Sequence, residues 1–277
     1  MSTASSSNAG SVTLVEWQYS GVPRSGPTRA VVLVPAWGSP SARYPVVVAL
    51  HGRGEAVKPP AEGAMGWARD YAMTRAFDRL RVPPLTSDDY EGFADLDRMA
   101  SLNASLREKP FGGVIVACPH VPDMDWSDGA GVRAVGRFVT DLLLPQVRRE
   151  MPALTAPEST GIDGVSMGGA LALRIGLTNP DVFGAVGSLQ AAIHEDDANE
   201  LTELARAARA RRPAMKLRLL TSHDDYFRAA IARTSEVWRA AGVAHDFADV
   251  PGPHDYVFNR GPGSIELLTW HDRALVH

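Results

Sequence analysis

The chain has 277 residues, of which 28 are Lys or Arg and 32 are Asp or Glu, giving a formal net charge of −4. A chain of this length can bury a large hydrophobic core as a single domain. The weak negative charge and the scattered arginines exclude an electrostatic basis for binding nucleic acid or an anionic membrane surface. Cys118 is the only cysteine, which excludes an intrachain disulfide and a zinc site built on several thiolates.

The first residues, 1–11, are rich in serine and lack any apolar periodicity. We predict that they are disordered and that residues 12–277 form a single domain. The segment has neither the basic start nor the apolar stretch of a secretory signal. No apolar run in the sequence approaches the roughly 20 residues that a membrane-spanning helix needs. We therefore expect a cytoplasmic protein with no membrane partner.

Strand and helix patterns alternate along the chain. Residues 12–19 and 30–34 predict two antiparallel strands joined by a turn rich in glycine and proline. Residues 46–50 and 114–118 are continuously apolar, which is typical of strands covered on both faces. Further strands are predicted at residues 160–165, 183–189, 217–221 and 243–250. Helical patterns are found at residues 133–150, 169–177, 198–211, 227–241 and from 264 onward. This order predicts an α/β protein with a mostly parallel central sheet flanked by helices.

The interval between the first two buried strands, residues 55–113, is too long for a simple crossover. Two groups of apolar residues recur in it at helical spacing: Met73, Phe77 and Leu80, and then Phe93, Leu96, Met99 and Leu102. We expect a helical insertion after the strand that ends at Leu50, placed so that it could cover a site at that end of the sheet.

A Gly-x-Ser-x-Gly motif follows the predicted strand 160–165, where residues 164–168 are Gly-Val-Ser-Met-Gly. A strand before the motif and a helix rich in small residues after it are typical of a nucleophile elbow. In this tight turn the serine hydroxyl projects alone from the top of the sheet. Ser166 is therefore the candidate nucleophile. Because a free serine hydroxyl is a weak nucleophile, it needs a base within hydrogen-bond reach.

Reactive groups in a parallel sheet gather at the carboxyl ends of the strands. His254 follows the last predicted strand in a loop stiffened by two prolines, which makes it the candidate base. The acid that orients it should follow strand 217–221, where Asp224 and Asp225 are adjacent. We favour Asp225 and expect the other aspartate to cap the next helix. A metal site formed by His223, Asp224 and His254 ranks lower, because a triad explains these groups without an ion.

The tetrahedral intermediate of acyl transfer carries a developing oxyanion that needs preorganised hydrogen-bond donors. The first candidate donor is the backbone N–H of Met167, at the start of the helix after the serine. The second is expected in the glycine-rich turn of residues 51–54, at the N–H of Arg53 or alternatively at that of Gly54.

Four short motifs together resemble the α/β-hydrolase superfamily: Leu-His-Gly at 50–52, Gly-Val-Ser-Met-Gly-Gly at 164–169, the acid Asp225, and Pro-His-Asp-Tyr at 253–256. More narrowly, they are similar to its esterase D/feruloyl esterase-like and dienelactone hydrolase-like branches. The resemblance implies the α/β-hydrolase fold and a serine carboxyl-ester hydrolase that works through an acyl-enzyme, without a metal or organic cofactor. Two positions depart from the pattern. Ser222 stands where glycine is usual in the acid turn, and a dienelactone hydrolase proper would carry cysteine at position 166.

We expect a small-molecule ester as the partner, and Trp67, Trp126 and Gln190 as residues that bind it. Tyr71, Met124 and Asp125 are further candidates for the same pocket. The alternative function is that of a thioesterase or an acyltransferase using the same triad. A peptidase and a non-catalytic binding protein on the same fold rank below these.

Overall fold

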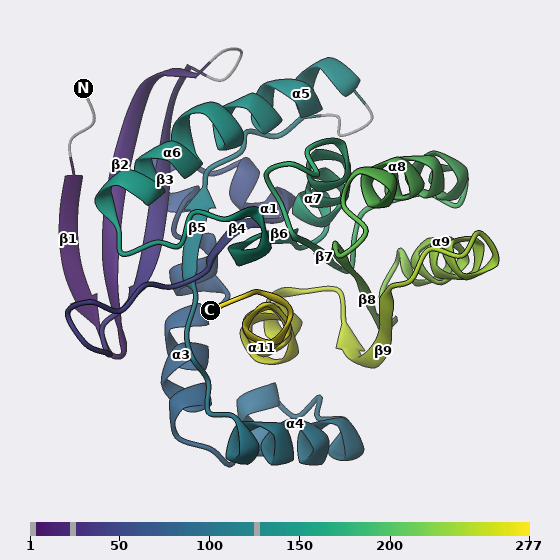
Figure 1. Cartoon of the computed structure of the whole chain (residues 1–277). Helices are drawn as coiled ribbons and strands as arrows, with labels where there is room; N and C mark the ends of the chain where they lie inside the picture. The colour runs from purple at the N-terminus through teal and green to yellow at the C-terminus, as the bar shows by residue number, and fades with distance from the viewer. Residues whose placement is uncertain (1–3, 23–25, 125–127) are drawn as a thin grey trace.

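The computed structural model describes residues 4–22, 26–124 and 128–277, which form a central sheet with helices on both of its faces (Figure 1). The described residues form nine strands in the order β1-β2-β3-β5-β4-β6-β7-β8-β9. All pairs among β4 to β9 are parallel, and β3, β2 and β1 extend the sheet antiparallel from β5. The strands are β1 Ala4–Ala9, β2 Val12–Val22, β3 Gly26–Pro35, β4 Val46–Leu50, β5 Ile115–Pro119, β6 Thr160–Gly164, β7 Ala185–Leu189, β8 Lys216–Asp224 and β9 Asp246–Pro253. This is the mostly parallel α/β sheet that the sequence predicts.

The helices form two layers. One layer packs on the sheet face that carries Val48 and Leu50 and consists of α5 Gly129–Arg137, η3 Phe138–Leu143, α6 Leu144–Glu150, α7 Met167–Thr178, α8 Asp197–Arg211 and α9 Arg228–Ala240. The other covers the face that carries Val47 and Ala49, with η1 Gly66–Asp70, α3 Met73–Arg81, α4 Leu96–Glu108 and α11 Ser264–Ala274. Short helical segments complete the chain: α1 Arg53–Ala56, α2 Pro60–Gly63, η2 Ser87–Tyr90, η4 Pro157–Ser159, α10 Tyr256–Phe258 and η5 Asn259–Gly263. Within the described ranges, no helix is both long and apolar enough to cross a membrane.

The two layers explain why β4 and β5 are continuously apolar. Successive side chains of a strand point to opposite faces of the sheet, so a strand covered on both faces needs apolar residues at every position. All five residues of β4 are buried, and so are all five of β5, including Cys118.

The prediction of a disordered N-terminus is wrong for residues 4–9. These residues form β1, which pairs antiparallel with β2 from Ala4 opposite Trp17 to Ala9 opposite Val12. The pairing uses backbone groups, and backbone hydrogen bonds need no apolar alternation in the sequence. A serine-rich segment therefore carries little sequence signal for such an edge strand.

The segment between β4 and β5 is helical, as predicted, and it contributes to the layer around α11. Arg98 of α4 donates two hydrogen bonds to the Glu266 carboxylate of α11, at 2.5 and 2.7 Å. The prediction that Leu96 belongs to the apolar face of α4 is wrong, because this side chain is 65% exposed. The helix instead buries Leu106 and Asn103, and Asn103 hydrogen-bonds to backbone atoms of Leu85.

Candidate active site

Ser166 lies in a strained turn between β6 and α7. Its backbone has φ 56° and ψ −119°, a conformation that residues other than glycine rarely adopt. The turn is close-packed, since a methyl group at Gly164 would collide with the carbonyl of Gly168, and one at Gly168 would collide with the carbonyl of Leu50. These contacts give the two motif glycines a steric reason, and Ser166 itself is partly exposed.

His254 connects Ser166 to Asp225. Its Nε2 lies 3.0 Å from the Ser166 Oγ, and its Nδ1 lies 2.7 Å from the Asp225 Oδ1. The Asp225 carboxylate also accepts hydrogen bonds from the Thr221 hydroxyl at 2.7 Å and from the Phe227 N–H at 3.0 Å. Because a carboxylate can only accept, the His254 Nδ1 carries the hydrogen and its Nε2 is free to accept the Ser166 proton.

The structure therefore distinguishes between the two adjacent aspartates. The Asp225 side chain is fully buried against His254, whereas Asp224 is exposed. Asp224 does not take the capping role expected for it either. The N-cap residue of α9 is Phe227, with no side-chain cap, and the Phe227 N–H is bound by Asp225.

The two predicted oxyanion donors are both first residues of helices. Met167 begins α7 and Arg53 begins α1. The first N–H of a helix has no acceptor within that helix, so it remains available to a ligand. The turn that holds Arg53 lies beside the serine: a methyl group added at Gly52 would be in van der Waals contact with the Ser166 Cβ, at 3.7 Å.

His51 fixes the position of this turn. Its Nδ1 lies 2.9 Å from the Gly52 carbonyl oxygen, and its Nε2 lies 3.0 Å from the Val121 N. Burial lowers the pKa of His51 to about 4, so the ring is neutral near pH 7. A neutral ring can donate from Nδ1 to Gly52 and accept from Val121 at Nε2. His51 thus connects the turn after β4 to the loop after β5.

The structure places Trp67 in the protein core. The side chain is fully buried, and its ring meets that of Tyr71 edge to face at a centroid distance of 4.9 Å. Trp67 therefore packs in the core behind the site. The prediction that it forms part of an exposed substrate pocket is wrong. Trp126 and Asp125, predicted for the same pocket, lie outside the described residues.

Gln190 is also buried, directly after β7, and its amide is used inside the protein. Its Nε2 donates to the Ser222 Oγ at 2.6 Å and to the Pro253 carbonyl oxygen at 2.8 Å. Pro253 precedes His254, so Gln190 supports the histidine loop. Both hydrogens of its amide nitrogen therefore have acceptors, whereas its Oε1 is buried with no hydrogen-bond partner within the described residues. The contacts of Gln190 are those of a structural residue, and its predicted contact with substrate stays a prediction.

Two aromatic residues that the sequence patterns do not indicate as site residues lie beside His254. The rings of Tyr226 and Phe227 lie 5.1 and 5.4 Å from the imidazole, centroid to centroid. Tyr226 is 81% exposed, so it presents an aromatic surface to solvent next to the candidate base. The available signal was the aromatic pair that directly follows Asp225 in the sequence.

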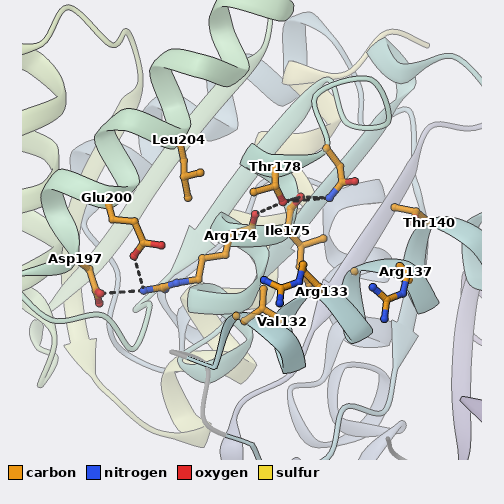
Figure 2. A pocket seen from close by; sticks show the side chains of 13 residues that line it. Val132, Arg133, Arg137, Thr140, Arg174, Ile175, Thr178, Asp197, Glu200 and Leu204 are labelled. Carbon is orange, nitrogen blue, oxygen red and sulfur yellow. Dashed lines mark hydrogen bonds and ion pairs between the residues drawn. The ribbon is translucent and has the colours of Figure 1, made fainter. Parts of the chain in front are cut away.

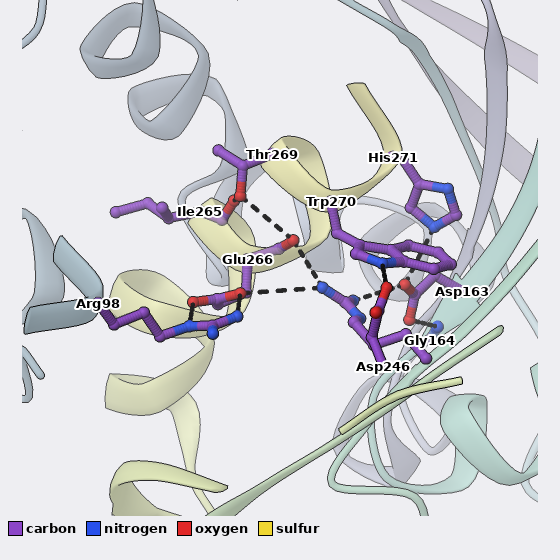
Figure 3. A network of polar contacts seen from close by, with 10 residues as sticks. Arg98, Asp163, Gly164, Asp246, Ile265, Glu266, Thr269, Trp270 and His271 are labelled. Atoms are coloured by element: carbon purple, nitrogen blue, oxygen red, sulfur yellow. Dashed lines mark hydrogen bonds and ion pairs between the residues drawn. The ribbon is translucent and has the colours of Figure 1, made fainter. Parts of the chain in front are cut away.

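Buried charges hold the strand that leads to Ser166 (Figure 3). Asp163 of β6 accepts hydrogen bonds from the Gly164 N–H at 2.8 Å, from Arg218 at 2.8 Å and from His271 at 3.0 Å. Arg218 also donates to the Glu266 carbonyl oxygen at 2.7 Å. Burial lowers the pKa of His271, which keeps its ring neutral, so Arg218 is the group that compensates the charge of Asp163.

A cavity of about 470 Å³ lies elsewhere, among α5, α7 and α8 (Figure 2). Arg174 lines it and pairs with Asp197 at 2.9 Å and with Glu200 at 3.6 Å. The cavity adjoins the C-terminal half of α7, whereas Ser166 precedes its N-terminus, and none of the predicted site residues lines it. We therefore do not assign the substrate to this cavity. Among the described residues, no cluster of three or more His, Cys, Asp or Glu side chains is arranged to hold a metal ion.

Comparison with known proteins gives a family match and a group of similar structures. Residues 123–194, which include Ser166, match the family described as "Putative esterase". The comparison with curated proteins finds no match.

Three solved structures illustrate the likeness. A ferulic acid esterase has a TM-score of 0.73 and 18% identity, with 97% of this chain and 100% of that chain covered. The ferulic acid esterase of Anaeromyces mucronatus has a TM-score of 0.60 and 17% identity, covering 99% and 90%. An S-formylglutathione hydrolase from Agrobacterium tumefaciens has a TM-score of 0.63 and 16% identity, covering 98% and 99%. The resemblance predicted from the sequence is thus confirmed: this chain has the α/β-hydrolase fold and is similar to serine esterases of the esterase D/feruloyl esterase type.

Proposed function

We propose that this protein is a serine hydrolase that cleaves a carboxylic ester through an acyl-enzyme intermediate. The observation that carries the proposal is the hydrogen-bonded series from Asp225 through His254 to Ser166, at 2.7 and 3.0 Å, with the serine in a strained elbow. The match of residues 123–194 to an esterase family supports the same class of reaction.

In the first half of the reaction, the Ser166 Oγ attacks the ester carbonyl while its proton passes to the His254 Nε2. The carbonyl oxygen becomes an oxyanion, which the N–H groups of Met167 and Arg53 stabilise by hydrogen bonds. His254 then donates the proton to the leaving alcohol, and the acyl group remains on the serine. In the second half, His254 takes a proton from water as the water oxygen attacks the acyl-enzyme. The bond between the acyl carbon and the Ser166 Oγ then breaks, and His254 returns its proton to the Oγ, which releases the acid and restores the free enzyme. Asp225 holds the imidazole in the required tautomer and stabilises its cationic form.

Covalent labelling of Ser166 tests the proposal. We expect the wild-type protein to react with a fluorophosphonate probe and to hydrolyse p-nitrophenyl acetate, and we expect Ser166→Ala to do neither. Ser188→Ala is a matched control, because Ser188 is a buried serine whose hydroxyl has no hydrogen-bond partner within the described residues. A folded wild-type protein that remains unlabelled would overturn the proposal.

Thioester hydrolysis or acyl transfer is the second candidate, because the same acyl-enzyme forms from a thioester and can be passed to an acceptor other than water. Similarity to the structures of S-formylglutathione hydrolases favours testing thioesters first. We would compare kcat/KM for acetyl and feruloyl esters with that for acyl thioesters of matched chain length. A preference for thioesters above about tenfold, which corresponds to about 1.4 kcal/mol, would replace the ester by a thioester as substrate.

A further inference from the structure

Glu55 is a buried carboxylate two residues after Arg53, and it has no role in the proton transfers described above. The residue is only 1% exposed. Its Oε2 accepts a hydrogen bond from the Tyr71 hydroxyl, and its Oε1 accepts one from the Tyr256 hydroxyl at 2.6 Å. The Lys58 Nζ lies 3.4 Å from the Oε1 and supplies a compensating positive charge. Both oxygens of a buried acid are thus occupied by groups from other parts of the chain.

Tyr71 connects Glu55 to the turn that presents Arg53. The Gly52 N–H donates to the Tyr71 hydroxyl oxygen at 3.2 Å. Burial, and then the nearby charge of Glu55, raise the pKa of Tyr71, so the phenol keeps its proton and gives it to the carboxylate. The Gly52 N–H therefore donates to the Tyr71 hydroxyl, which in turn donates to the Glu55 carboxylate. Since His51 binds the Gly52 carbonyl oxygen, residue Gly52 is held through both its N–H and its C=O.

Tyr256 connects the same carboxylate to the histidine loop. It is the first residue of α10 and lies two positions after His254. Two glycines leave room for this arrangement. A methyl group at Gly54 would lie 2.5 Å from the Tyr256 hydroxyl oxygen, and one at Gly66 would lie 2.5 Å from the Glu55 Cγ. Glu55 thus joins the turn that presents the Arg53 N–H to the segment that carries His254.

We propose that Glu55, acting through Tyr71 and Tyr256, is a positioning residue. It holds the turn of residues 51–54 and the loop that carries His254 in place relative to Ser166. The inference rests on the proposed function. Its physical basis is that a donor aimed at a developing oxyanion acts only in a narrow range of positions, so that a displacement of about 1 Å can lower the rate about 100-fold. Hydrogen bonds in such a buried series also polarise and strengthen one another.

The experiment compares single hydroxyl deletions in full-length protein. Tyr71→Phe and Tyr256→Phe each remove one donor to Glu55 and keep the ring, and Glu55→Gln removes the charge. Tyr90→Phe is the matched control, because Tyr90 is a buried tyrosine whose hydroxyl has no hydrogen-bond partner within the described residues. Functional sites are counted by fluorophosphonate labelling run to completion, so that kcat is expressed per competent site and misfolded protein does not enter it.

We expect the kcat for p-nitrophenyl acetate to fall about 10-fold to 100-fold in Tyr71→Phe and in Glu55→Gln, with little change in KM. Tyr256→Phe should show a smaller loss of the same kind, and Tyr90→Phe none. The affinity for a trifluoromethyl ketone, whose adduct with Ser166 carries an oxyanion, should fall in parallel with kcat. A role in folding alone would reduce the number of labelled sites and leave both quantities per site unchanged.

Two failures can be told apart. If the wild-type protein is labelled and active, and the Glu55, Tyr71 and Tyr256 variants keep wild-type kcat per labelled site, the positioning role is overturned and the proposed function stands. If the folded wild-type protein is neither labelled nor active, the proposed function fails and the positioning role fails with it. Equal losses in Tyr90→Phe and Tyr71→Phe would also overturn the inference, since the effect would not depend on the bond to Glu55.

Discussion

Replacing Asp225 by asparagine should slow turnover without weakening substrate binding. In the proposed mechanism, the His254–Asp225 contact becomes an ion pair only after His254 has taken the Ser166 proton, so its charge would stabilise the transition state more than the ground state. For charge centres about 4 Å apart and an effective dielectric constant of about 20, the Coulomb energy is about 4 kcal/mol. Losing it corresponds to a decrease in kcat of about 10³-fold. An amide oxygen placed at the Oδ1 position could keep the bonds from His254 and Phe227, so we expect the protein to fold.

The assay is steady-state hydrolysis of p-nitrophenyl esters, with kcat and KM measured separately. Asp224→Asn is the control, because it makes the same chemical change one residue away on an exposed side chain. We expect Asp224→Asn to retain the wild-type kcat. A kcat for Asp225→Asn within about tenfold of wild type, corresponding to about 1.4 kcal/mol, would refute the role given to Asp225. A large loss in Asp224→Asn alone would assign the acid to Asp224.

Three further predictions concern stability and specificity. Because the unfolded chain protonates His51 near its ordinary pKa of 6.5 while the folded protein resists protonation until about pH 4, stability should fall as the pH falls through this range. Between pH 7 and pH 4, the free energy of unfolding measured by urea denaturation should decrease by about 3 kcal/mol more in wild type than in His51→Gln. Arg218→Met should lower the free energy of unfolding by about 3–5 kcal/mol, because Asp163 keeps a buried charge without its partner. Tyr226→Ala should lower kcat/KM for methyl esters of aromatic acids up to about tenfold relative to aliphatic ones, because an exposed ring next to His254 can stack on an aromatic acyl group.

Each of these predictions has a contrary result. Parallel pH profiles of wild type and His51→Gln would contradict the first. The second uses Arg206→Met as its control, because Arg206 is an exposed arginine whose pair with Glu203 is also exposed. A loss in Arg218→Met below about 1 kcal/mol, the range of a surface pair, would contradict it. Equal effects of Tyr226→Ala on aromatic and aliphatic esters would contradict the third.

Local chemistry was enough to predict most of the strands and helices and the elbow geometry around Ser166. The apolar runs of β4 and β5 require a sheet covered on both faces, and the glycines at 164 and 168 are required by the close packing of the Ser166 turn. Both signals lie within a few residues of the structure they predict. The edge strand β1 has no comparable signal, because its serine-rich sequence contributes mainly backbone hydrogen bonds to β2.

Tertiary contacts decided which polar side chains meet. Adjacent residues at a strand end point in different directions. Which of Asp224 and Asp225 faces His254 therefore depends on how the end of β8 is oriented in the assembled fold. In the sequence, Glu55 has the character of a surface residue. Its burial and its hydrogen bonds follow only from contacts with Tyr71 and Tyr256, which are 16 and 201 positions away. Sequence patterns along one segment report how that segment folds. The partners of a buried polar group come from distant segments, and their identity follows only from the assembled fold.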